Sequence, residues 1–213
     1  MSGVLIVGES GSGKSTSMRN LDPEKTMLIQ VVKKDLPFRP KGWLPLKIDK
    51  DGRRTGNIIV TRESKDIVRA ISKAKELGFE IVVIDDFQYL MSYELFERAT
   101  ETGYGKFTEM AIHAKNVLDA AREAEGVNVY VLTHVEMKDG VLKMKTVGKM
   151  LDEKLTPEGL MTIVLRAISS DGKHYFTTKN ADDTVKTPMG MFKEPKIDND
   201  LAQVDKTIRE YYS

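Results

Sequence analysis

A glycine-rich pattern with the chemistry of phosphate binding lies close to the start of the chain. Residues 8–15 read Gly-Glu-Ser-Gly-Ser-Gly-Lys-Ser and fit the pattern G-x-x-x-x-G-K-S/T. Glycines let backbone N–H groups converge on phosphate oxygens, and the positive end of a following helix adds to the attraction. Lys14 is expected to reach the β- and γ-phosphates of ATP, and the Ser15 hydroxyl to hold Mg²⁺. The predicted phosphate site is Gly8, Glu9, Ser10, Gly11, Ser12, Gly13, Lys14, Ser15 and Thr16. A turn of the same composition that binds no ligand is the alternative.

Two aspartates follow an apolar run further along the chain. Residues 81–84 are Ile-Val-Val-Ile, and Asp85 and Asp86 come directly after them. Open α/β sheets bind ligands at the carboxyl ends of their strands, so Asp85 is expected to complete the Mg²⁺ site beside the phosphate loop. Asp86 has two roles that the sequence leaves open: it orients an attacking water, or it caps the following helix.

Strands and helices alternate over most of the chain, and this organisation must position the loop and the aspartates. Apolar runs predict strands at 4–7, 26–32, 57–61, 80–84 and 127–133. Helical spacing predicts helices at 14–20, 64–77 and 89–125, the last interrupted at 101–105. This alternation is typical of an α/β fold with a mainly parallel sheet.

The C-terminal third has a different pattern. Apolar runs at 162–168 and 174–178 flank Ser-Ser-Asp-Gly, which predicts a β-hairpin. In the tail, 199–213, one helical face carries Leu201, Val204, Ile208 and Tyr211. The tail helix is expected to dock on its own core, and binding to a partner protein is the alternative.

The composition limits the classes of function. A length of 213 residues predicts one domain over 1–213. With 33 basic and 32 acidic residues, the whole chain does not predict a polyanion partner, so any nucleic-acid surface must come from local clustering. The absence of cysteine excludes a disulfide scaffold and a thiol nucleophile. Because no apolar run reaches 18 residues and no signal peptide is recognised, we expect a protein of the cytoplasm without a membrane partner (the host cytoplasm if the protein is viral).

Basic residues cluster locally in three segments. The irregular segment 33–54 has eight Lys and Arg against three Asp, and reads equally as a DNA surface or as an exposed loop. The segment 134–149 forms a predicted basic loop or hairpin, and a second cluster flanks the interruption at 101–105. Basic groups beside an aromatic ring suit single-stranded DNA. The predicted DNA-binding residues are Arg98, Tyr104, Lys106, Lys138, Lys143, Lys145 and Lys149. A solvated charged hairpin is the alternative, as is a lysine that reaches a neighbouring subunit's nucleotide.

The order of these elements resembles the core of the RecA recombinases. In that family a strand and helix precede the Mg²⁺ aspartate, as 57–61 and 64–77 do here, and a polar γ-phosphate sensor ends a later strand, where Thr133 and His134 lie. The resemblance therefore implies that His134 contacts the γ-phosphate. It also implies that the interruption near residues 103–105 and the segment 135–148 are the two DNA-binding loops.

The stretches 36–43, 131–135, 145–154 and 187–192 are similar to small phage ATP-binding proteins, the RecA-core single-strand annealing proteins of the Sak-four type. This resemblance implies a phage recombination protein that binds ATP and single-stranded DNA and promotes annealing or strand pairing. It further implies a homo-oligomer, as a ring or a filament, and a single-strand DNA-binding protein as a further partner.

One departure from the RecA pattern concerns catalysis. RecA-like ATPases carry a catalytic glutamate after the second core strand, but residues 29–34 here are Ile-Gln-Val-Val-Lys-Lys. Hydrolysis is therefore expected to be slow, with Asp86 as the best replacement carboxylate and Asp35 as the second. The predicted catalytic residues are Lys14, Asp86 and His134. Two other classes stay open: a nucleoside or nucleotide kinase, although 135–148 lacks the arginines of a kinase lid, and a nucleotide-dependent switch or assembly factor.

Overall fold

The fold is built on one sheet whose centre is parallel. The computed structural model describes residues 3–138, 140–147, 155–179 and 184–213. Within these ranges, eight strands form a sheet in the order β12-β11-β10-β1-β7-β6-β2-β5. The six parallel strands are β1 (Gly3–Val7), β2 (Thr26–Gln30), β5 (Ile58–Val60), β6 (Ile81–Asp85), β7 (Asn128–Thr133) and β10 (Ile163–Ser170). The antiparallel strands β11 (Lys173–Thr177) and β12 (Lys196–Asp198) extend one edge.

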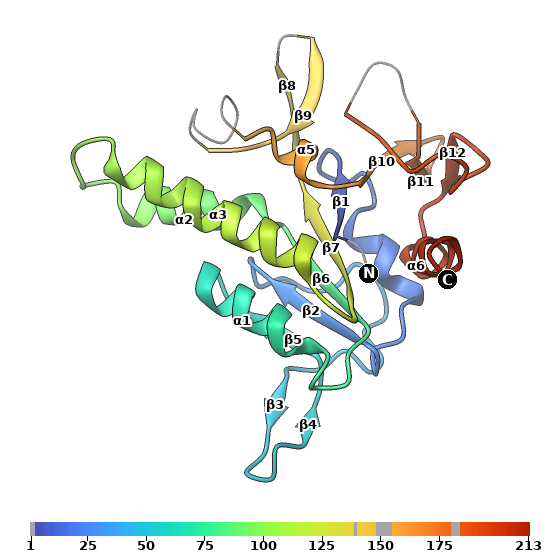
Figure 1. Ribbon diagram of the computed structural model, residues 1–213, viewed down its shortest axis with the longest axis horizontal. Helices are drawn as coiled ribbons and strands as arrows, with labels where there is room; N and C mark the ends of the chain where they lie inside the picture. The colour runs from blue at the N-terminus through green and yellow to red at the C-terminus, as the bar shows by residue number, and fades with distance from the viewer. Residues whose placement is uncertain (1–2, 139, 148–154, 180–183) are drawn as a thin grey trace.

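Helices cover both faces of this sheet (Figure 1). One face carries α1 (Ser64–Ala74), α2 (Gln88–Glu97) and α3 (Gly105–Glu123). The other face carries a 3-10 helix, η1 (Ser15–Asn20), and the C-terminal helix α6 (Leu201–Tyr211). Strand residues alternate between the two sides: Leu5 and Val7 pack under α1–α3, whereas Val4 and Ile6 pack with η1 and α6. The predicted α/β class with a mainly parallel sheet, a C-terminal hairpin and a terminal helix is confirmed.

The strand order brings distant parts of the chain to one edge. Strand β7 lies between β1 and β6, and its last residue, Thr133, pairs with Val7 at the end of β1. On the other side of β6, Gln30 at the end of β2 pairs with Asp85. The segments that follow β1, β7, β6 and β2 therefore leave the sheet side by side, which places the phosphate loop next to His134, Asp86 and Lys34.

Two small ribbons project from opposite ends of the molecule (Figure 1). The strands β8 (Val135–Lys138) and β9 (Val141–Met144) continue from β7 at the edge that carries the phosphate loop. The strands β3 (Lys47–Ile48) and β4 (Arg54–Thr55) lie at the other end, where Arg54 donates to the carbonyl oxygens of Leu77 and Glu24. Within the segment 134–149, for which a basic loop or hairpin was predicted, the described residues form the β8–β9 ribbon. Segment 33–54 is less irregular than predicted, because it contains the β3–β4 ribbon.

Local details differ from the sequence-based expectation in a few places. The helix predicted at 14–20 is the 3-10 helix η1, whose tighter turns end before Pro23. The short helix α5 (Pro157–Leu160) and strand β12 have no clear apolar period and were not predicted. The hairpin between β10 and β11 turns at Asp171 and Gly172, whose φ angles of 53° and 73° are those of the expected tight turn. No helix in the described ranges is both long and apolar enough to cross a membrane.

The tail helix docks on its own core, as expected. Leu201, Val204 and Ile208 are buried in the cluster that includes Met18 of η1. Tyr211, which shares their helical face in the sequence pattern, stays partly exposed at the end of the helix. The helix begins at Asp200, whose side chain accepts a hydrogen bond from the Ala202 N–H.

Candidate nucleotide-binding site

The phosphate loop leaves the end of β1 in a conformation that requires its glycines. Gly8 donates to the Thr133 carbonyl oxygen at 3.2 Å, and a Cβ at Gly8 would lie 2.7 Å from the carbonyl oxygen of Ala167. Gly11 and Gly13 have φ angles of 75° and 97°, which side chains rarely allow. The loop therefore keeps its backbone open toward the cavity, as a phosphate cradle requires.

Lys14 lies folded over this loop. Its Nζ donates to the carbonyl oxygens of Gly8 and Glu9, both at 2.8 Å, and the side chain is almost fully buried. Burial lowers the pKa of Lys14 from 10.5 to about 8, although Asp86 and Asp85 act in the opposite direction. A desolvated ammonium held by two carbonyl oxygens is poised to gain from a phosphate, which carries full negative charge.

Ser15 and Asp85 face each other as an oxygen-donor pair. The Ser15 Oγ lies 3.0 Å and 2.9 Å from the two carboxylate oxygens of Asp85, which is only 1% exposed. Burial raises the pKa of Asp85, and so does the neighbouring Asp86, while Lys34 at 3.9 Å lowers it. Because a hydroxyl beside a buried carboxylate is a donor set that Mg²⁺ prefers, these two residues fit the ion.

Two buried hydroxyls in the same region lack partners. The Oγ of Ser12 in the loop and the Oγ1 of Thr133 at the end of β7 are buried without a hydrogen-bond partner among the described residues. Buried polar groups are normally satisfied, so an unpaired pair at this edge points to a polar ligand or to water.

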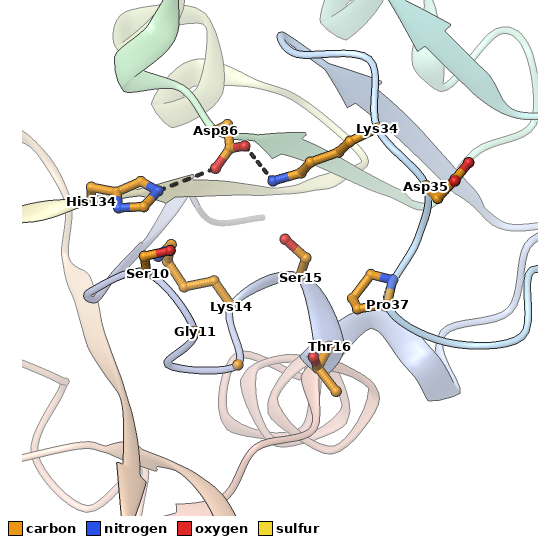
Figure 2. Close-up of a pocket in the computed structure, with 11 residues that line it drawn as sticks. Ser10, Gly11, Lys14, Ser15, Thr16, Lys34, Asp35, Pro37, Asp86 and His134 are labelled. Atoms are coloured by element: carbon orange, nitrogen blue, oxygen red, sulfur yellow. Dashed lines mark hydrogen bonds and ion pairs between the residues drawn. The ribbon is translucent and has the colours of Figure 1, made fainter.

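Asp86 bridges the side chains of Lys34 and His134 (Figure 2). The three side chains lie across from the phosphate loop and form the roof of the cavity described below. Its carboxylate forms an ion pair with Lys34 and lies 3.4 Å from the Nε2 of His134. Burial alone would raise the pKa of Asp86, but the hydrogen bonds from His134 and Lys34 hold it below its usual value. Asp86 also has a φ of 64°, an unusual value for a residue with a side chain.

This geometry bears on the helix-cap role of Asp86, whereas the water-orienting role stays a prediction. The N-cap residue of α2 is Phe87, and no side chain caps that helix. The carboxylate of Asp86 points to Lys34 and His134 instead (Figure 2). The helix-cap alternative is therefore wrong.

A cavity of about 230 Å³ lies between the loop and this roof. The sequence predicted most of its lining, including His134, and it named Asp35 as a second carboxylate. It missed Lys34 and Pro37 as lining residues. Gly8, Glu9, Ser12 and Asp85 do not line the cavity: Gly8, Ser12 and Asp85 are buried, and Glu9 is exposed to solvent. The lining residues are Ser10, Gly11, Gly13, Lys14, Ser15, Thr16, Lys34, Asp35, Pro37, Asp86 and His134.

His174 is a further residue of this region that sequence reasoning missed. It lies on β11, and its ring is so close to the loop that a Cβ at Gly13 would come within 2.7 Å of it. Its Nδ1 is buried without a hydrogen-bond partner in the described residues. The ring therefore packs against the loop backbone at Gly13.

The residues predicted to bind DNA fall into two groups. Arg98 is 19% exposed and forms ion pairs with Glu94, Glu101 and Glu109. Lys106 donates to the carbonyl oxygens of Arg98 at 2.9 Å and Glu101 at 2.7 Å. Both cations therefore hold the α2–α3 connection together. Tyr104 in that connection is 88% exposed.

The second group lies on the β8–β9 ribbon beside the cavity. Lys138 and Lys143 belong to the ribbon, and Lys145 follows it; Lys149 lies outside the described residues. The Lys145 N–H donates to the His134 carbonyl oxygen at 2.8 Å, which ties the base of the ribbon to the edge of the cavity. The structure thus ties the backbone of Lys145 to His134 at the edge of the cavity and keeps Arg98 and Lys106 engaged in the α2–α3 connection.

The fold is an α/β fold with a mainly parallel sheet, and a loop that fits the phosphate-binding pattern follows its strand β1. Among solved structures, the chain is similar to a KaiC-like protein of the hyperthermophilic archaeon Pyrococcus horikoshii, with a TM-score of 0.53. The two share 15% sequence identity, and the likeness covers 92% of this chain and 84% of the other. At this identity the likeness establishes the fold. No protein-family model and no curated protein matches the sequence.

Proposed function

We propose that this protein is a slow Mg²⁺-dependent ATPase that binds single-stranded DNA and promotes annealing or strand pairing in phage recombination. The observation that carries the nucleotide part is the pairing of Ser15 with the buried Asp85, beside a lysine folded over the phosphate loop. Bound Mg²⁺ would neutralise phosphate charge there. Lys14 would hold the β- and γ-phosphates, and the loop N–H groups would orient them.

The position of the β8–β9 ribbon supports the DNA part of the proposal. Lys143 and Lys145 have no ion-pair or hydrogen-bond partner for their ammonium groups among the described residues, so both can meet phosphates. Arg98 and Lys106 are left out of the proposed DNA surface because they are engaged within the α2–α3 connection. The ring or filament and the single-strand DNA-binding partner belong to the same proposal and rest on the resemblance alone.

Replacing both Lys143 and Lys145 with alanine is expected to weaken single-stranded DNA binding. DNA binding releases counterions in proportion to the number of phosphates that the protein contacts. Losing two contacts should therefore reduce the magnitude of the slope of log affinity against log salt by about 1.4. Filter binding with single-stranded DNA over a salt series, with and without ATP, measures this. The matched control replaces Lys47 and Lys50, two exposed lysines at the β3–β4 end of the molecule. If the control loses DNA affinity and the ribbon variant does not, segment 33–54 is the DNA surface instead.

ATP and DNA are expected to tighten each other's binding through His134. The imidazole lines the cavity, and the carbonyl oxygen of the same residue anchors the ribbon at Lys145. Coupling between two sites is typically about 1–3 kcal/mol and is reciprocal. His134→Ala should therefore leave DNA binding in place and remove its dependence on ATP in the same filter assay.

Asp86→Asn is expected to lower kcat for ATP hydrolysis by at least about tenfold if its carboxylate orients the attacking water. The low pKa of Asp86 makes it a weak base, which is one reason to expect slow hydrolysis in the wild type. Steady-state phosphate release measures kcat and KM separately, with Asp35→Asn as the comparison because Asp35 also lines the cavity. An unchanged kcat would remove Asp86 from the hydrolytic step.

A nucleotide-dependent switch is the second candidate function, and one observation favours it. A lysine, Lys34, lies over the cavity after β2, where a water-activating carboxylate would be expected. A protein that binds ATP, hydrolyses it at no measurable rate and changes a partner's binding would be such a switch. Phosphoryl transfer to a nucleoside without DNA binding would instead identify a kinase.

A further inference from the structure

Lys34 is fixed in place by the chain around it. The segment after β2 stays attached to β6, because the Val31 N–H donates to the Asp85 carbonyl oxygen at 3.2 Å. The buried side chain of Gln30 then donates from Nε2 to the Lys34 carbonyl oxygen at 2.9 Å. These bonds hold the backbone of Lys34 at the rim of the cavity, so the position of its side chain is a built feature of the site.

The ammonium of Lys34 is held over the cavity by carboxylates. It forms an ion pair with Asp86 and lies 3.9 Å from the Oδ2 of Asp85, and its side chain remains 41% exposed. An ammonium has three N–H donors, and Asp86 uses one of them. Figure 2 shows Lys34, Asp86 and His134 in a row that faces Lys14 and Ser15 across the cavity.

The charges at the roof explain why a cation is needed there. Asp86 is buried in the wall of the cavity, and its carboxylate would repel a terminal phosphate there. Lys34 neutralises that carboxylate and leaves donors for the phosphate. Lys14 on the floor would meet the same phosphate chain from the opposite side.

We propose that Lys34 is a γ-phosphate ligand supplied by this chain itself, oriented by Asp86 and Gln30, and that it makes the site prefer ATP to ADP. This inference rests on the proposed ATP binding. A cation in this position holds the terminal phosphate and also pairs with Asp86, the carboxylate proposed to orient the attacking water, which also accounts for slow hydrolysis. Asp86 and Gln30 are positioning residues in this arrangement.

Lys34→Met is expected to weaken binding of a non-hydrolysable ATP analogue with Mg²⁺ by about 10- to 100-fold, the range of one or two charge-assisted hydrogen bonds. The affinity for Mg²⁺–ADP should change by less than about threefold, because ADP has no γ-phosphate. Isothermal titration of the two nucleotides gives the ratio directly. The matched control is Lys33→Met, which removes the neighbouring, exposed lysine that does not line the cavity. Lys34→Arg keeps the charge and should retain most of the preference.

A double variant distinguishes the loss of a phosphate contact from a loss of folding. Lys34→Met leaves Asp86 without its cation, so we include Lys34→Met with Asp86→Asn, which removes both charges; thermal melting confirms folding. This double variant should bind the ATP analogue better than Lys34→Met alone, because the repulsion is gone. Equal weakening of the ATP analogue and ADP in Lys34→Met would overturn the inference and leave ATP binding standing. A wild-type protein that binds neither nucleotide would overturn the proposed function itself.

Discussion

Replacing Lys14 with alanine will remove ATP binding while the protein remains folded. The wild-type ammonium is buried over the phosphate loop and held by two carbonyl oxygens, so a phosphate chain would be a stronger partner. Hydrogen bonds to charged groups contribute about 1.5–3 kcal/mol each, and two such bonds correspond to a loss of about 100-fold or more. Isothermal titration with Mg²⁺–ATP measures the loss. Lys25→Ala, which removes an exposed lysine paired with Glu80, is the control and should bind as the wild type does.

The stability of this variant can be anticipated from the pKa of Lys14. The folded pKa is about 8 and the usual value is 10.5, so between pH 8 and 10.5 the unfolded chain binds more protons and stability rises with pH. Below pH 8 the charged side chain is present in both states, and its burial costs about 3 kcal/mol. Lys14→Ala should therefore melt at the same temperature as the wild type at pH 7, or higher. A folded variant with unchanged ATP affinity would contradict the nucleotide assignment.

The part of the site that the sequence predicted has local signatures. The phosphate loop is one continuous stretch, and Asp85 follows an apolar run directly. The rule that parallel strands present their carboxyl ends at one edge was enough to place them together. The structure agrees, since Ser15 and Asp85 are in contact.

The part that the sequence missed depends on distant contacts. In the sequence, Lys34 was noted only because it belongs to the segment where RecA-like ATPases carry a catalytic glutamate. Its ion pair with Asp86 requires the pairing of β2 with β6 and a left-handed backbone at Asp86. His174 is separated from Gly13 by more than 150 residues, and no local pattern relates the two. Such contacts follow from strand order, which single-sequence patterns do not specify.

The acidic neighbours of Arg98 were present in the sequence, but the interpretation gave more weight to the basic and aromatic residues around it. Its cluster was read from basic residues and an aromatic ring, yet Glu94 lies four residues before Arg98 and Glu101 three after it. The first spacing places opposite charges on one helical face, whereas Arg98 and Glu101 lie beyond the end of α2 at Glu97. The structure forms both pairs and adds Glu109 from α3. Counting acidic neighbours at helical spacing would have separated this cluster from the β8–β9 lysines.

Asp205→Ala is expected to lower the free energy of unfolding by about 3–5 kcal/mol, the cost of leaving buried polar partners unpaired. Asp205 lies on α6 and is buried against the sheet. Its Oδ1 accepts hydrogen bonds from Asn128 at 2.7 Å and from Tyr130 at 2.8 Å, and its Oδ2 accepts one from Arg209 at 2.6 Å. The carboxylate therefore joins the tail helix to β7.

Urea denaturation of Asp205→Ala, with Glu210→Ala as the control, tests this. Glu210 pairs with Lys206 on the same helix, but both side chains are exposed, so the control should change stability by no more than about 0.5 kcal/mol. The destabilisation of α6 in Asp205→Ala should also extend to η1, which follows the phosphate loop. The two helices are linked because Asp200 at the start of α6 accepts a hydrogen bond from Asn20 of η1 at 2.7 Å. If Asp205→Ala costs no more than the control, water reaches these donors and the tail helix is held by its apolar face alone.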